Sequence, residues 1–166
     1  MARAPKIALV AAALVVVAEA NLRRSEPSHE ASAIGALRAI VSGQLAYRTA
    51  NGGYAPSLAA LAAACRNGQL GFVSPDLTRD PTIRQGYEIR LQAEPAARPG
   101  PADCNGVRTA SGFFATAKPI QQSESASRAF AVDKSGVIWS DTSGVPPQPP
   151  FKETRTTKRL GADQGR

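Results

Sequence analysis

The two cysteines are the most reactive side chains of this sequence, and we expect them to form a disulfide bond. Cys65 and Cys104 are the only cysteines in 166 residues, and a pair of cysteines in an exported chain is usually oxidised. A bridge between these positions would stabilise a small domain by about 4 kcal/mol in the loop-entropy model. Two free thiols are the alternative. The pair alone lacks the further ligands that a zinc site needs.

Three oxygen-bearing side chains near the end of the folded part could contribute ligands to a calcium ion. These are Asp133, Ser135 and Asp141, and carboxylate and hydroxyl oxygens are the ligand type that calcium takes. Asp and Ser also bond to the backbone of their own turns, and that alternative explains them without a metal. We expect no other cofactor.

The remaining residues predict no catalytic machinery. His29 is the only histidine, and no Gly-x-Ser-x-Gly sequence supplies a nucleophilic serine for it. The chain also lacks a phosphate-binding glycine loop and a dinucleotide-binding fingerprint. We therefore expect that the protein is not an enzyme.

The beginning of the chain, residues 1–20, predicts export. Arg3 and Lys6 precede the uninterrupted apolar run 7–18, and Ala18 and Ala20 form an A-x-A cleavage pattern. The apolar run is shorter than the roughly 20 residues that a membrane-spanning helix needs. We favour a cleaved signal peptide, and a short membrane anchor is the alternative.

An amphipathic helix is predicted over 29–53, and the other elements of the fold are expected to pack around it. Apolar residues recur at helical spacing along it, and Asn51-Gly52-Gly53 is a strong stop signal. The opposite side is made of small residues, which let another backbone approach closely. The residues of this helix-packing face are Ser32, Gly35, Ala39, Gly43 and Ala46. A short second helix over 58–65, capped by Ser57, is one candidate to cover this face, and a neighbouring subunit is the other.

Four strands follow, and the first shows the clear alternation of apolar and polar residues that is typical of a half-buried strand. They are predicted over 86–94, 112–118, 128–133 and 137–140. The expected fold class is α+β: a long N-terminal helix packed on a small antiparallel β-sheet, a short second helix and a disordered C-terminal tail. Phe113 and Phe114 point to opposite faces of one strand, so we expect one of them to be left for a partner.

We divide the chain into the N-terminal segment 1–20, a folded domain over 21–141 and a Pro-rich basic tail over 142–166, which we expect to be disordered. The formal net charge is +7, and only 5% of the residues are aromatic, which limits the size of the core. A basic tail predicts attraction to an anionic polymer or to nucleic acid.

Two stretches of the sequence resemble type IV pilin-like proteins and the major pseudopilins of type II secretion systems. The first is NLRRSEPSHEASAIGALRAIVSGQLAYRTANGGYAPSLAAL (21–61), and the second is SRAFAVDKSGVIWSD (127–141). In that family, an Asn-Leu pair and basic residues lead into a helix of the "NEASA-G-LR-I" type and a "GY-PSLAAL" turn. An aromatic residue, an Asp and "SGVI" mark its final hairpin. The resemblance covers about residues 21 to 140.

The resemblance implies a non-enzymatic structural subunit of a pilus or of a secretion pseudopilus, and hence a role in protein transport. It implies partners of the same family, contacted through the N-terminal helix. It also implies a location in the cell envelope. Residues 7–20 would hold an uncleaved protein in the inner membrane, facing the periplasm, whereas a cleaved protein would be periplasmic or secreted. The group Asp133, Ser135 and Asp141 would then be a remnant of the calcium loop of major pseudopilins.

The sequence departs from this family at its start. The first glycine is Gly35, so no prepilin leader is recognisable before Ile7, and Glu19 lies at the far end of the apolar run. We expect either a start upstream of Met1 or an ordinary signal peptide that releases a soluble pilin-like module. Such a module, binding an anionic polymer or nucleic acid, is the alternative function.

Overall fold

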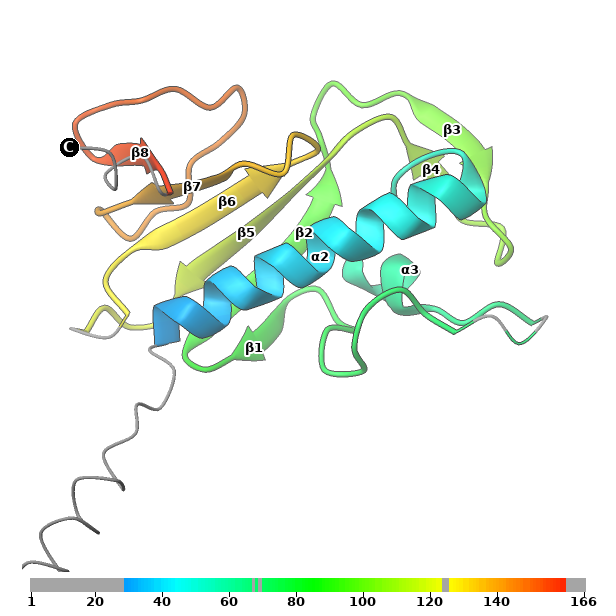
Figure 1. The fold of residues 1–166 in the computed structure, drawn as a ribbon, viewed down its shortest axis with the longest axis horizontal. Helices are drawn as coiled ribbons and strands as arrows, with labels where there is room; N and C mark the ends of the chain where they lie inside the picture. Colours follow the sequence, from blue (N-terminus) through cyan, green and yellow to red (C-terminus); the bar gives the residue numbers. More distant parts are fainter. Residues whose placement is uncertain (1–28, 67, 69, 124–125, 161–166) are drawn as a thin grey trace, which may run out of the picture.

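The structure is a computed structural model that describes residues 29–66, 68, 70–123 and 126–160. Two helices precede eight strands within these residues (Figure 1). The helices are α2 (His29–Asn51) and α3 (Leu58–Ala62). The strands are β1 (Thr82–Arg84), β2 (Tyr87–Ala93), β3 (Pro99–Ala102), β4 (Arg108–Ala110), β5 (Phe113–Pro119), β6 (Ala129–Asp133), β7 (Ile138–Asp141) and β8 (Thr157–Arg159).

Both helix ends follow the local sequence signals. Gly52, directly after α2, has a φ of 76°, the left-handed conformation that glycine adopts without a steric penalty. Ser57 caps α3, because its hydroxyl accepts a hydrogen bond from the backbone N–H of Ala60. None of the helices in the described part of the chain is long and apolar enough to cross a membrane.

The main sheet has the strand order β1-β2-β5-β6-β7-β8, and each neighbouring pair is antiparallel. β3 and β4 form a separate two-stranded sheet. Ala110 of β4 also exchanges backbone hydrogen bonds with Tyr54, just beyond the end of α2. The small sheet is therefore also bonded to the segment that follows α2.

Helix α2 lies across one face of the main sheet, over β2, β5 and β6 (Figure 1). The core between them is built from the helix residues that face the sheet and from alternate strand residues. It includes Ala33, Ala36, Leu37, Ile40, Tyr47, Tyr87, Ile89, Leu91, Phe113, Ala115, Ala117, Phe130 and Val132. Burial of this apolar surface is the main source of stability for the pair of layers.

The face of the sheet opposite α2 is buried as well. Phe113 belongs to the core under α2 and Phe114 to the opposite face, yet their exposed fractions are 1% and 2%. The expectation that one of the two phenylalanines is left for a partner is therefore wrong. On this opposite face, the C-terminal segment (residues 142–160) folds back onto β7, where Phe151 packs on Trp139 with ring centroids 5.7 Å apart.

The fold class expected from the sequence is wrong. The described residues form a helix followed by a six-stranded antiparallel sheet and a second sheet of two strands, not a long helix packed on a small sheet. The C-terminal tail is not disordered up to residue 160, because β8 pairs with β7. The strands that the sequence did not predict are three or four residues long, too short for an alternation to be recognised.

Candidate functional site

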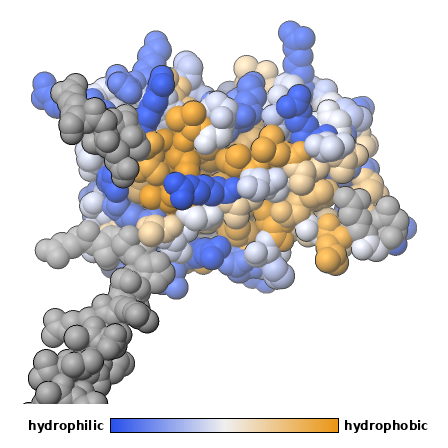
Figure 2. All heavy atoms as spheres, viewed as in Figure 1, coloured by the Kyte–Doolittle hydropathy of each residue, from blue (hydrophilic) through white to orange (hydrophobic). Residues whose placement is uncertain are grey.

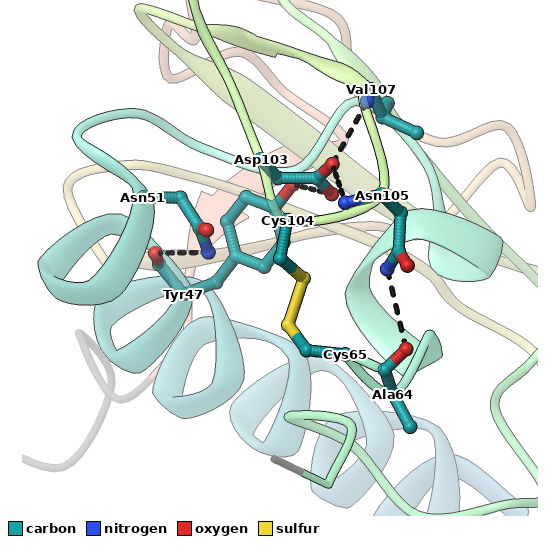
Figure 3. Close-up of a disulfide and its surroundings, with 8 residues drawn as sticks. All are labelled: Tyr47, Asn51, Ala64, Cys65, Asp103, Cys104, Asn105 and Val107. Carbon is teal, nitrogen blue, oxygen red and sulfur yellow. Dashed lines mark hydrogen bonds between the residues drawn. A yellow bond between two sulfur atoms is a disulfide. The ribbon is translucent and has the colours of Figure 1, made fainter. Parts of the chain in front are cut away.

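The disulfide bond joins the segment after α3 to the β3–β4 hairpin (Figure 3). Cys65 and Cys104 are bonded, with their Cα atoms 5.7 Å apart, so this prediction is confirmed. Cys65 is buried and Cys104 is exposed. The side-chain amide of Asn105 donates a hydrogen bond to the carbonyl of Ala64, so a polar contact runs beside the covalent link.

Asp103, next to the disulfide, attaches the same hairpin to the end of α2. The hydroxyl of Tyr47 donates to its Oδ2 at 2.7 Å, and the backbone N–H groups of Asn105 and Val107 donate to its Oδ1 at 2.9 and 2.8 Å (Figure 3). Burial would raise the pKa of Asp103, but these hydrogen bonds outweigh it and lower that pKa. Burial and the Asp103 carboxylate raise the pKa of Tyr47, so the phenol stays protonated as the donor.

The first turn of α2 is held to the start of β6 by Glu30. Its carboxylate accepts two hydrogen bonds from the guanidinium of Arg128, at 3.0 and 2.7 Å, and further ones from the backbone N–H groups of Ser127 and Arg128. Burial would raise the pKa of Glu30, but the bonds and charge of Arg128 lower it overall. Side-chain anchors therefore fix α2 to the body near each of its ends.

Between these anchors, α2 presents an outer surface with little charge. Residues 31–51 contain Arg38 and Arg48 and no carboxylate. Leu45 is 52% exposed, and Val41 is half-buried at the edge of the core. Figure 2 shows apolar residues gathered in a broad band across this side of the molecule. We call the exposed side of α2 its outer surface below.

Of the five residues predicted as the helix-packing face, Gly43 is the one that is closely covered. A Cβ atom there would lie 2.6 Å from the carbonyl oxygen of Phe72. Ala39 and Ala46 are exposed, Ser32 is half-buried, and a Cβ on Gly35 would meet nothing within 4 Å. The segment that covers Gly43 is 71–74, and it bounds a shallow, largely apolar groove of about 520 Å³ beside α2. The residues lining this groove are Ala39, Ser42, Gly43, Ala46, Gly71, Phe72, Val73 and Ser74.

The structure does not bring together the three residues considered for calcium. In the β6–β7 hairpin, Asp133 and Ser135 lie at the turn, where Asp133 accepts a hydrogen bond from the Ser135 backbone N–H. Asp141 lies at the other end of β7, opposite Ala129. Within the described ranges, no group of three or more His, Cys, Asp or Glu side chains could hold a metal ion.

Asp141 instead organises the C-terminal segment. It is 7% exposed, and its carboxylate accepts hydrogen bonds from the backbone and hydroxyl of Ser143 and from the hydroxyls of Thr156 and Thr157. Burial would raise the pKa of Asp141, but these donors lower it to about 2. The carboxylate thus holds both ends of a loop that its composition predicts to be disordered.

Two further polar residues join the helices to the rest of the fold, and this role was not predicted from the sequence. Asp80 accepts hydrogen bonds from the backbone N–H groups of Leu58, at the start of α3, and of Leu91 in β2. Gln44 is fully buried and bonds both the N–H and the carbonyl of Ala55. The position of Gln44 on the buried side of α2 was a usable signal, since a buried amide needs partners. Asp80 carries no comparable signal.

The predicted cleavage residues Ala18 and Ala20, like the apolar run before them, lie outside the described residues. Comparisons of the chain with protein-family models, with curated proteins and with solved structures found no match. The candidate functional site is therefore the outer surface of α2, together with the residues that fix it.

Proposed function

We propose that the protein is a non-enzymatic structural subunit of the cell envelope, of the pilin-like or pseudopilin-like kind, which contacts other subunits through α2. The observation that carries this proposal is the outer surface of α2, which has little charge, carries no carboxylate and is fixed near both ends by Glu30–Arg128 and Tyr47–Asp103. A rigid, preformed surface loses little conformational entropy when a partner binds it.

The composition of this surface indicates the kind of contact. Ala39 and Ala46 allow a neighbouring backbone to approach closely, and Leu45 offers a side chain that a partner can bury. Arg38 and Arg48 favour a partner with acidic residues at the rim of the contact. A role in a pilus or in a type II secretion pseudopilus is supported by the sequence resemblance alone.

Site-specific photo-crosslinking in native cells tests the proposal. A crosslinking residue replaces Ala46 on the outer surface of α2, and the matched control replaces Gln92, which is exposed on the other side of the sheet in β2. We expect crosslinked species larger than the monomer from position 46 and not from position 92. Equal crosslinking at both positions, or none at position 46, would contradict assembly through α2.

The alternative function is a soluble exported module that binds an anionic polymer or nucleic acid. One observation favours it: the C-terminal segment is folded and presents four exposed basic residues against the single acid Glu153. These residues are Lys152, Arg155, Lys158 and Arg159. Binding of this kind weakens steeply as salt is raised from roughly 50 to 200 mM. An affinity that does not change over this range would argue against this function.

The two functions also predict different fates for the N-terminal segment. The intact mass of the native protein, measured separately in membrane and soluble fractions, distinguishes them. A membrane-bound species that keeps the apolar run 7–18 supports the subunit, and a soluble species beginning at Asn21 supports the released module.

A further inference from the structure

A cleft of about 330 Å³ lies on the face of the main sheet opposite α2, between the β6–β7 hairpin and the C-terminal segment. The strand register places Trp139 of β7 beside Arg159 of β8 on this face, with the side chain of Asp133 at the end of β6. Pro150 and Phe151 of the C-terminal segment complete its walls. The cleft shares no residue with the outer surface of α2.

The aromatic wall of the cleft lies beside a guanidinium. The centre of the Arg159 guanidinium lies 5.2 Å from the centroid of the Trp139 ring, within cation–π range. The N–H groups of a guanidinium lie along the edge of its plane, where they can donate hydrogen bonds. The Arg159 side chain is 60% exposed, and its nearest acidic partner, Glu153, is 3.9 Å away, so its hydrogen-bonding capacity is not used up in that pair.

The opposite side of the cleft supplies acceptors. Oδ1 of Asp133 accepts a hydrogen bond from the Ser135 backbone, and a carboxylate has room for about four hydrogen bonds in all. The hydroxyl of Ser135 lies in the same turn. One carboxylate and one guanidinium cancel in net charge, and Val137, Pro150 and Phe151 make the walls apolar.

We propose that this cleft binds one or two sugar units of a neutral glycan. A sugar ring presents C–H groups on its faces and hydroxyls on its rim, which matches apolar walls flanked by a carboxylate acceptor and a guanidinium donor. The volume lies near the lower end of the range for small-ligand sites. A polyanion fits less well, because Asp133 would repel it.

The single tryptophan of the chain is the probe. Trp139 fluorescence of the full-length protein is titrated with chitotriose, cellotriose and maltotriose, three neutral oligosaccharides. We expect a saturable change with at least one of them. We expect Arg159→Gln and Asp133→Asn each to weaken that binding about 10-fold or more. The matched control is Lys158→Gln, since it removes the same charge from the neighbouring residue, whose side chain alternates to the other face of the sheet.

Folding of each variant is verified by its urea midpoint, so that a loss of binding is not mistaken for unfolding. Unchanged affinity in Lys158→Gln supports the cleft. The proposal is overturned if none of the three oligosaccharides gives a saturable change, or if Lys158→Gln weakens binding as much as Arg159→Gln. It is also overturned if dextran sulfate binds more tightly than the neutral sugars and both Lys158→Gln and Arg159→Gln reduce that binding equally. That result would assign binding to the basic surface as a whole.

Discussion

Glu30 accepts two hydrogen bonds from the guanidinium of Arg128, although the two residues are 98 positions apart. The pair holds the first turn of α2 against the start of β6. Near the other end of the helix, the hydroxyl of Tyr47 donates a hydrogen bond to Asp103, 56 positions away, and so holds α2 against the disulfide-bonded hairpin. The position of α2 on the sheet is therefore fixed by polar contacts near its ends as well as by apolar packing between them.

Replacing Glu30 with Gln tests the first of these anchors. We expect a loss of about 1–2 kcal/mol of unfolding free energy at pH 7, less than for a fully buried pair because Arg128 is 38% exposed. The folded-state pKa of Glu30 is lowered from its usual 4.5. Its contribution is therefore fully present above that value and is lost as the pH falls through the lowered pKa.

Urea unfolding at pH 7 and at acidic pH measures both effects. Glu88→Gln is the control, because Glu88 pairs with Arg90 only two positions away in the same strand, and we expect a loss below about 0.5 kcal/mol from such an exposed pair. Equal losses in the two variants would contradict a long-range role for Glu30.

The folding of the C-terminal segment depends on the charge of Asp141. Its pKa falls from 3.8 in the unfolded chain to about 2 in the folded protein. The charged form therefore stabilises the fold by about 2 kcal/mol above pH 4, and this contribution disappears between roughly pH 4 and pH 2. We expect Asp141→Asn to lower the stability by about that amount at pH 7 and to flatten the acid dependence. Thermal or urea unfolding measured as a function of pH tests this. Asp76→Asn, at an exposed position, is the control, and the same pH profile in both variants would contradict a special role for Asp141.

Two glycines of α2 give opposite predictions for the same substitution. A Cβ at Gly35 would meet nothing within 4 Å, so Gly35→Ala should stabilise the helix by up to about 1 kcal/mol through helix propensity. A Cβ at Gly43 would lie 2.6 Å from the backbone oxygen of Phe72 and 2.9 Å from Val73. Gly43→Ala should therefore destabilise the protein by about 1–3 kcal/mol, since the backbone of 71–74 must move. A stabilising Gly43→Ala, measured by urea unfolding, would show that this segment does not lie on the helix.

The disulfide should supply a large share of the stability. We expect the double variant Cys65→Ser, Cys104→Ser to lose about 4 kcal/mol, the loop-entropy value for this separation. Urea unfolding of the oxidised wild type and of the double variant measures the difference. Dithiothreitol should destabilise the wild type and leave the double variant unchanged. A loss below about 1 kcal/mol in the variant would mean that the surrounding contacts, Tyr47–Asp103 and Asn105–Ala64, hold the hairpin without the bond.

Several elements could be predicted because their signals are local. The stop of α2 follows from Gly52, the cap of α3 from Ser57, and β2 from the alternation of apolar and polar residues along it. The disulfide was predicted from the presence of two cysteines in a chain whose sequence predicts export. In each case a few neighbouring residues carry the whole signal, and the rest of the fold does not alter it.

The tertiary structure decided what depends on partners far along the chain. Strands β1, β3, β4 and β8 are too short to show a pattern and exist because a neighbouring strand supplies their hydrogen bonds. The Pro-rich segment looked disordered, yet it folds because Asp141 and Trp139 provide the contacts that its own composition lacks. The sequence predicts that small residues share one face of α2. It does not predict which of these residues another segment covers. Gly43 meets the 71–74 segment and Gly35 does not, because close packing depends on where a distant backbone passes.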